Sequence, residues 1–163
     1  MLRKTALFII LALVAMQFFH ADKNINSSDD EDRNDISMAF AIPDNVQDVL
    51  QKSCYDCHSN NTNYPWYAEI QPIGWWLDHH ITEGKSELNF NEFATYSPRR
   101  QYKKLEEIIE QVKEGEMPLG SYTLIHKDAV VSKEKKIAIT KWANAAIDSM
   151  KARYPPDSLI RKK

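Results

Sequence analysis

The sequence has few of the residues that build nucleotide-binding loops or disulfide-rich domains. Only four of its 163 residues are glycines, and they are scattered, which excludes a phosphate-cradling glycine-rich loop. Its two cysteines are too few and too close together for the disulfide framework of a small secreted domain. A formal net charge of −2, without a basic stripe carrying interleaved aromatic residues, excludes a nucleic-acid-binding surface.

The first twenty residues have the pattern of an export signal. Arg3 and Lys4 precede an apolar stretch over residues 6–19 that only Gln17 interrupts. The stretch is shorter than the ~20 residues of a typical membrane-spanning helix, and no small-residue cleavage site follows it. We expect residues 1–20 to be an uncleaved signal anchor, with a cleaved signal peptide as the alternative. Both place the remaining chain on the periplasmic side of a bacterial inner membrane, either anchored there or exported as a soluble protein.

Three segments follow the apolar stretch. Residues 21–41 are polar, acidic and without apolar periodicity, so we expect a flexible, solvated tether. Residues 42–155 contain the apolar residues of a single folded domain, and residues 156–163 form a basic tail.

Apolar residues recur at helical spacing through residues 42–155, whereas strand-like alternation is weak. The first predicted helix begins at Pro43 and ends at the cysteines, and the second begins at Pro72. Ser97 caps a third helix that stops at Gly115, and Ser132 caps the last. The apolar residues of these four helices are Val46, Val49 and Leu50; Ile73, Trp76, Leu77, His80 and Ile81; Leu105, Ile108, Ile109 and Val112; and Ile137, Ile139, Trp142, Ala146, Ile147 and Met150. We therefore predict a small all-α domain.

The two cysteines belong to a motif that attaches haem. Residues 54–58 read Cys-Tyr-Asp-Cys-His, which is the C-x-x-C-H pattern of c-type haem. Two thiols at this spacing can each bond to one vinyl group of the porphyrin, and the adjacent imidazole then ligates the iron. We predict one covalent haem c held by Cys54 and Cys57, with His58 as the proximal iron ligand.

Other uses of the same residues stay open at this point. A pair of cysteines three positions apart can be a redox-active dithiol or a simple disulfide. It can also bind zinc together with His58, if His79 or His80 completes the four ligands that a structural zinc site requires.

Met117 is the best-placed residue for the second axial position of the iron. It precedes Pro118 on a predicted loop between two helices, where its thioether can reach the far face of the haem. A thioether opposite an imidazole raises the reduction potential. The alternatives are that Met117 only fills the core, that His79 or His80 is the ligand, or that the position is open.

Two further features lie close to these residues in the sequence. Aromatic residues gather over residues 64–67 and at Trp75 and Trp76, which is typical of a haem crevice or of an ordinary core. His126 follows the Met117 loop, and we expect it to pack that loop rather than to bind a haem propionate.

Over roughly Val46 to Ile147 the chain resembles the small bacterial haem-binding domain proteins of the cytochrome c type. The resemblance rests on residues 54–60, on Tyr64-Pro65-Trp66, and on residues 116–118 followed by 122–126. The order of elements is similar to that of single-haem class I cytochromes c. It implies that the first and last helices cross, which brings Val49 or Leu50 near Trp142.

The resemblance also implies roles for individual residues. These are thioether attachment at Cys54 and Cys57, proximal ligation by His58 and distal ligation by Met117. The long segment between Met117 and the last helix departs from smaller cytochromes.

The expected function is that of a membrane-tethered electron carrier rather than an enzyme, exchanging electrons with unidentified redox partner proteins. One alternative is a haem-based sensor or enzyme with an open or labile sixth ligand position. Another is a haem-free interaction domain that uses the thiols or zinc.

Overall fold

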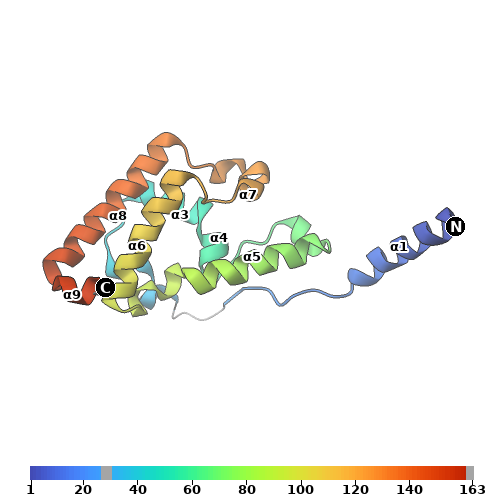
Figure 1. Ribbon diagram of the computed structural model, residues 1–163, viewed down its shortest axis with the longest axis horizontal. Helices are drawn as coiled ribbons and strands as arrows, with labels where there is room; N and C mark the ends of the chain where they lie inside the picture. The colour runs from blue at the N-terminus through green and yellow to red at the C-terminus, as the bar shows by residue number, and fades with distance from the viewer. Residues whose placement is uncertain (27–30, 161–163) are drawn as a thin grey trace.

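The protein folds as a set of helices joined by loops (Figure 1), in a computed structural model that describes residues 1–26 and 31–160. Within these ranges there is no β-strand, only an isolated bridge between Ile25 and Asn61. The all-α prediction is therefore confirmed. Residues 27–30 of the predicted tether and residues 161–163 of the predicted basic tail lie outside the described residues.

The four predicted helices of the domain all form, and shorter helices link them. The α-helices are α1 Leu2–Met16, α2 Ile36–Ala39, α3 Asp44–Ser53, α4 Tyr55–His58, α5 Ile73–Glu87, α6 Pro98–Glu114, α7 Gly120–Ile125, α8 Lys133–Arg153 and α9 Pro156–Leu159. The 3-10 helices are η1 Glu31–Asn34, η2 Trp66–Glu69, η3 Phe90–Thr95 and η4 Lys127–Ala129.

The sequence signals at the helix ends act as expected. The Ser97 and Ser132 hydroxyls accept hydrogen bonds from the backbone N–H groups of Arg100 (3.4 Å) and Lys135 (3.3 Å). Gly115 ends α6 with a φ of 82°, a left-handed conformation that favours glycine. Local chemistry therefore sets the bounds of α6 and the start of α8.

The main core lies between α3, α6 and α8, and Figure 1 shows α6 and α8 side by side. Leu50, Leu105 and Trp142 are buried in this cluster, and Trp142 Nε1 donates a hydrogen bond to the Ala41 carbonyl (3.1 Å). The first and last helices of the domain thus pack together, as the resemblance implied. Ile137 is an exception, because it is exposed although its spacing predicted a core position.

A second, smaller cluster lies between η2 and α5. Tyr67, Leu77 and Ile81 are buried there, and Cys57 packs against them. Ile73 and Trp76, which we expected on the same inner face of α5, are 43% and 47% exposed. The short helix α4 connects the two clusters, because Cys54 packs against the first and Cys57 against the second.

The expectation of a free tether up to residue 41 is wrong for most of its described part. Ile36 has no exposed surface and belongs to the main core, and Asp35 is 7% exposed. Asn24 donates hydrogen bonds to the Ser59 carbonyl (3.0 Å) and to Thr62 Oγ1 (2.9 Å). A few apolar side chains, with Ile36 the most buried, and the Asn24 amide anchor this segment, and such anchors leave no periodic pattern in the sequence.

The predicted basic tail also begins inside the folded domain. Residues 156–159 form α9, and Leu159 is 3% exposed within the main core. Arg99 Nη2, on α6, donates to the Asp157 carbonyl (2.7 Å). The fold therefore extends beyond the expected boundary at residue 155.

Helix α1 stands apart from the domain and has no buried residue. Across residues 1–26 and 31–160, no helix has both the length and the apolarity required to cross a membrane.

Candidate functional site

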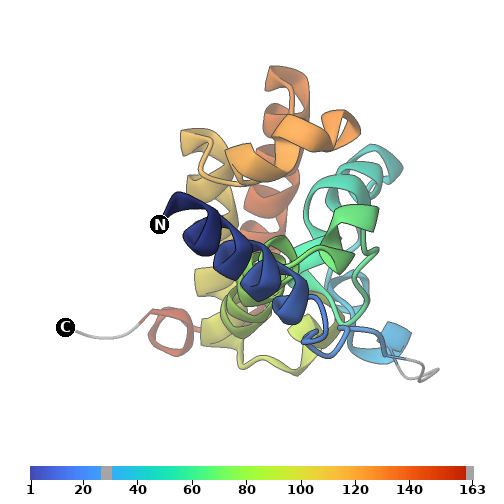
Figure 2. The ribbon, with the colours of Figure 1, turned by 90° about the vertical axis from the view of Figure 1, so that its right-hand side faces the viewer.

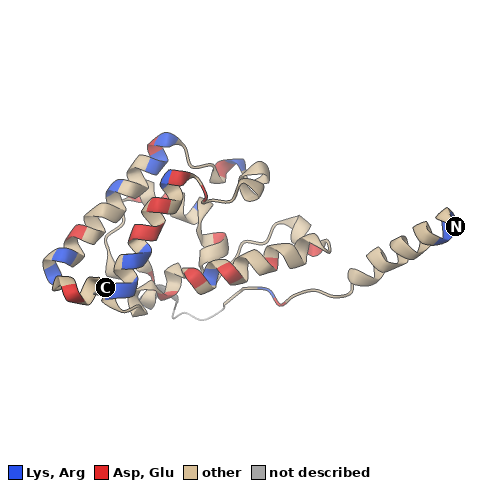
Figure 3. Ribbon diagram, viewed as in Figure 1, with Lys and Arg blue, Asp and Glu red and all other residues tan. Residues whose placement is uncertain are grey.

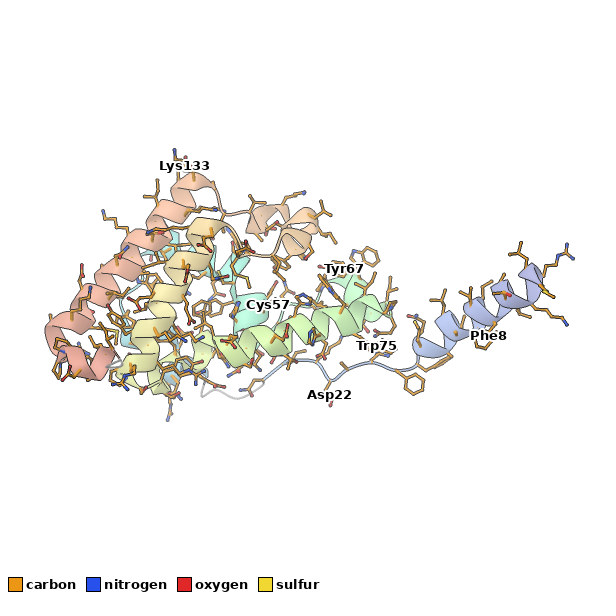
Figure 4. All side chains as sticks on the ribbon, in the orientation of Figure 1. Phe8, Asp22, Cys57, Tyr67, Trp75 and Lys133 are labelled. Carbon is orange, nitrogen blue, oxygen red and sulfur yellow. The ribbon has the colours of Figure 1, made fainter. Side chains whose placement is uncertain are left out.

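The cysteine motif forms a single helical turn attached firmly to the core. Cys54 ends α3 with non-helical angles (φ −129°, ψ −42°), and α4 begins directly after it. The Tyr55 ring stacks on Phe90 with centroids 5.0 Å apart, and its hydroxyl donates to Asp35 Oδ2 (2.8 Å). These contacts fix the orientation of α4, and Figure 4 shows Cys57 near the middle of the molecule beside α5.

Two adjoining cavities open beside α4. One of about 490 Å³ is lined by all four of Cys54, Cys57, His58 and Met117. The other, of about 410 Å³, shares Cys54, His58 and Met117 with it and extends along α6. Each volume falls within the ~300–1,000 Å³ typical of sites for small molecules and cofactors.

The two thiols differ from those of a redox-active dithiol. Both are free, and burial raises the pKa of Cys54 to about 12 and that of Cys57 to about 11. Both groups therefore stay protonated at neutral pH, whereas a nucleophilic dithiol requires a lowered pKa. No disulfide joins them.

The ring of His58 is prepared for metal ligation. Its Nδ1 lies 3.0 Å from the Leu88 carbonyl oxygen. Because a carbonyl only accepts hydrogen bonds, Nδ1 carries the proton and Nε2 presents its lone pair. Burial lowers the pKa of His58 by more than the hydrogen bond to the Leu88 backbone raises it. A neutral imidazole with its second nitrogen bonded to a carbonyl is the usual state of a metal-bound histidine.

Met117 lies at both cavities, whereas only one of the two alternative histidine ligands lies at either of them. Met117 is half-buried on the loop after α6 and lines both cavities. His80 lines the larger one, and its Nδ1 lies 2.8 Å from the Trp76 carbonyl. His79 is exposed, lies 3.4 Å from a carboxylate oxygen of Glu83, and lines neither cavity.

Side chains beyond Met117 attach its loop to the cysteine motif. The Tyr122 hydroxyl donates to Asp56 Oδ2 (2.6 Å), and the Tyr122 ring stacks on His126. His126 Nε2 lies 2.7 Å from the Tyr67 hydroxyl, so this histidine connects the loop to η2. The role of Asp56 has no sequence signal, because its partner lies 66 residues away.

Two polar residues on the cavity walls were not predicted from the sequence. Ser53 Oγ is buried without a hydrogen-bond partner in the part of the chain that the structure describes. Lys104 is 8% exposed and pairs with Glu87 (3.0 Å) and Glu107 (2.6 Å). Its position four residues before Ile108 on an amphipathic helix is the signal that predicts an inward-facing lysine.

These residues fit a haem. The larger cavity combines two thiols, a neutral imidazole and a thioether, and the unpaired Ser53 hydroxyl lies on its wall. A zinc site receives no such support. Among residues 1–26 and 31–160, no three His, Cys, Asp or Glu side chains form a group suited to a metal ion.

Comparison with protein families gives a match over most of the chain. Residues 11–145, well over half of the chain, match a family of proteins described by their haem-binding domain. The matched range contains the cysteine motif and Met117. No curated protein and no solved structure matches the chain.

Proposed function

The chain belongs to the haem-binding domain family, and on this premise we propose that it is a membrane-tethered electron carrier with one covalent haem c. One observation carries the proposal. Cys54, Cys57, His58 and Met117 line the same cavity of about 490 Å³, although Met117 is far from the other three in sequence. The two thiols would attach the haem, His58 would ligate the iron on one side, and Met117 would ligate it on the other.

The bound haem would supply a reversible one-electron couple. The protein's contribution is to hold the two proposed iron ligands, His58 and Met117, in fixed positions. The Leu88 carbonyl fixes the His58 ring, and the bond from Tyr122 to Asp56 holds the Met117 loop against α4. Ligands that do not move between oxidation states keep the reorganisation on electron transfer small.

Electron transfer of this kind needs no catalytic acid or base, so we propose a carrier rather than an enzyme. Its partners would be redox proteins on the periplasmic side of a bacterial inner membrane, where residues 1–20 would hold the chain. The apolar, exposed α1 supports this location.

The proposal is tested by absorption spectra of the full chain, produced in a host that matures cytochromes c. The spectra are recorded oxidised and reduced, with and without carbon monoxide. A six-coordinate, low-spin spectrum with a methionine–iron band, unchanged by carbon monoxide, is the expected result. A high-spin haem that binds carbon monoxide rapidly would replace the carrier with a sensor or enzyme that has an open sixth position.

A further inference from the structure

Large apolar side chains lie exposed at the end of the domain that faces α1. Trp66 is 76% exposed, Trp76 47%, Ile73 43% and Ile125 59%, and all four line one apolar cavity of about 380 Å³. Trp75, which is 39% exposed, adjoins them on α5. We call these five residues, Trp66, Ile73, Trp75, Trp76 and Ile125, the aromatic rim. Monomeric soluble proteins rarely expose a contiguous apolar patch of this kind without a binding role.

The charges of the protein lie elsewhere. Figure 3 shows blue and red residues along α6, α8 and the part of α5 farther from α1, whereas α7 is tan. In the sequence, residues 64–77 contain one charged residue, Glu69, and residues 117–126 contain none. Lys23 pairs with Glu69 at 2.6 Å. The domain therefore has a charged end and an aromatic end with few charges, and the aromatic end is the one next to α1 (Figure 2).

The segment that joins α1 to the domain is fixed to this same end. Gln17 Nε2 donates to the Gln71 carbonyl (3.0 Å), and the Gln71 N–H donates back to Gln17 Oε1 (2.9 Å). Trp75 Nε1 donates to the Phe19 carbonyl (2.9 Å), and Figure 4 shows Trp75 at the end of α5 nearest to α1. The end of the apolar helix is thus held at a set position beside the rim.

From these contacts we infer that the aromatic rim is a bilayer-contact surface, which seats the domain on the headgroup layer of the membrane that holds α1. The inference rests on the membrane tether of the proposed function. Tryptophans are enriched at membrane interfaces, where the ring is buried and the indole N–H stays close to polar groups. Cys57 lines the cavity that the rim surrounds, so the edge of the haem site nearest Cys57 faces the lipid surface. The carrier then exchanges electrons while its domain rests on the membrane surface, rather than while the domain moves freely at the end of a flexible tether.

Photocrosslinking of the full, haem-loaded chain in phosphatidylcholine vesicles tests this orientation. Benzoylphenylalanine replaces one residue at a time: Trp66 or Trp76 on the rim, Leu11 on α1, and Ile137 on α8. Ile137 is the matched control, because it is an apolar residue with 59% exposure at the charged end. After illumination, mass spectrometry detects adducts carrying the mass of one phospholipid.

Phospholipid adducts at both rim positions, with none at Ile137, are the expected result. Adducts at Leu11 without adducts at the rim would overturn the seated orientation and leave the tether intact. Rim adducts with a second copy of the chain, or equal labelling of Ile137, would also overturn it. No lipid adduct at any position would overturn the tether and the orientation together.

Discussion

His58 and Met117, the two residues that would bind the iron, are held in the protein by different means. The His58 ring has a direct hydrogen bond from Nδ1 to the Leu88 carbonyl, within a packed core. Met117 depends on its loop, whose backbone N–H groups at Gly115, Glu116 and Met117 all point to the Gln111 carbonyl. The distal side is therefore the more sensitive to changes outside the ligand itself.

Replacing the thioether tests the role of Met117. Met117→Ala is expected to lower the reduction potential by a sizeable part of the ~0.8 V range that axial ligands control, because a thioether favours reduced iron. Potentiometric titration followed by absorbance measures the change. Met38→Ala is the control, since Met38 is 64% exposed on α2 and lines neither haem-site cavity. An unchanged potential in Met117→Ala would remove Met117 as the ligand.

The Tyr122 hydroxyl offers a second test at this scale. Tyr122→Phe removes the 2.6 Å bond to Asp56 and should lower the free energy of unfolding by about 1–2 kcal/mol, because the acceptor is charged and part-buried. Guanidinium unfolding measures the loss, and the methionine–iron band should weaken as the loop loosens.

Tyr102→Phe is the matched control for this experiment. Tyr102 is buried, and its hydroxyl makes no hydrogen bond among the contacts of the described residues, so its removal should be near neutral. Equal stabilities of the two variants would show that the bond to Asp56 does not hold the loop.

Helices α4 and α5 approach each other unusually closely. A Cβ added at Gly84 would lie 2.8 Å from the Cys57 carbonyl oxygen, a backbone atom that cannot rotate away. The glycine therefore allows the cysteine turn to lie against α5, where the smaller core cluster holds both.

Gly84→Ala should separate the two helices. Although alanine favours a helix, the steric conflict with Cys57 should lower the free energy of unfolding by about 1–3 kcal/mol and reduce the haem content of the purified protein. Gly120→Ala is the control, because nothing lies within 4 Å of a Cβ there. Full haem content and wild-type stability in Gly84→Ala would mean that the close approach is not required.

Helix α2 holds the segment before the domain in the core. Ile36 is fully buried, so Ile36→Ala should cost about 2–5 kcal/mol of unfolding free energy, while Met38→Ala on the same short helix should cost little. Thermal and denaturant unfolding compare the two. An unchanged unfolding free energy in Ile36→Ala would mean that this segment is a free tether after all.

At the scale of the whole molecule, periodic patterns and local chemistry predicted most of the fold. Helices α3, α5, α6 and α8 follow from apolar spacing, and Ser97, Gly115 and Ser132 set ends that the structure confirms. The short elements were not predictable in the same way. Ile36 and Leu159 lie in segments without a sustained helical spacing of apolar residues, and only tertiary contacts show that they are buried.

The candidate site also contains some features that a local sequence pattern predicts and others that depend on tertiary contacts. The motif of Cys54, Cys57 and His58 is a local pattern, and so it could be recognised from the sequence alone. The bond from Tyr122 to Asp56 and the unpaired Ser53 hydroxyl depend on how distant segments meet. Met117 was predicted from its loop, and the cavity that it shares with His58 supports that assignment without testing the iron bond itself.

The central claim is that Cys54 and Cys57 hold one haem covalently, and mass spectrometry of the denatured full chain tests it most directly. We predict that the chain keeps the added mass of one haem after unfolding and acid–acetone extraction. Cys54→Ala and Cys57→Ala should each retain at most one thioether link, and the double variant should lose its haem on extraction. A wild-type chain that releases its haem on denaturation, or that carries none, would contradict the account.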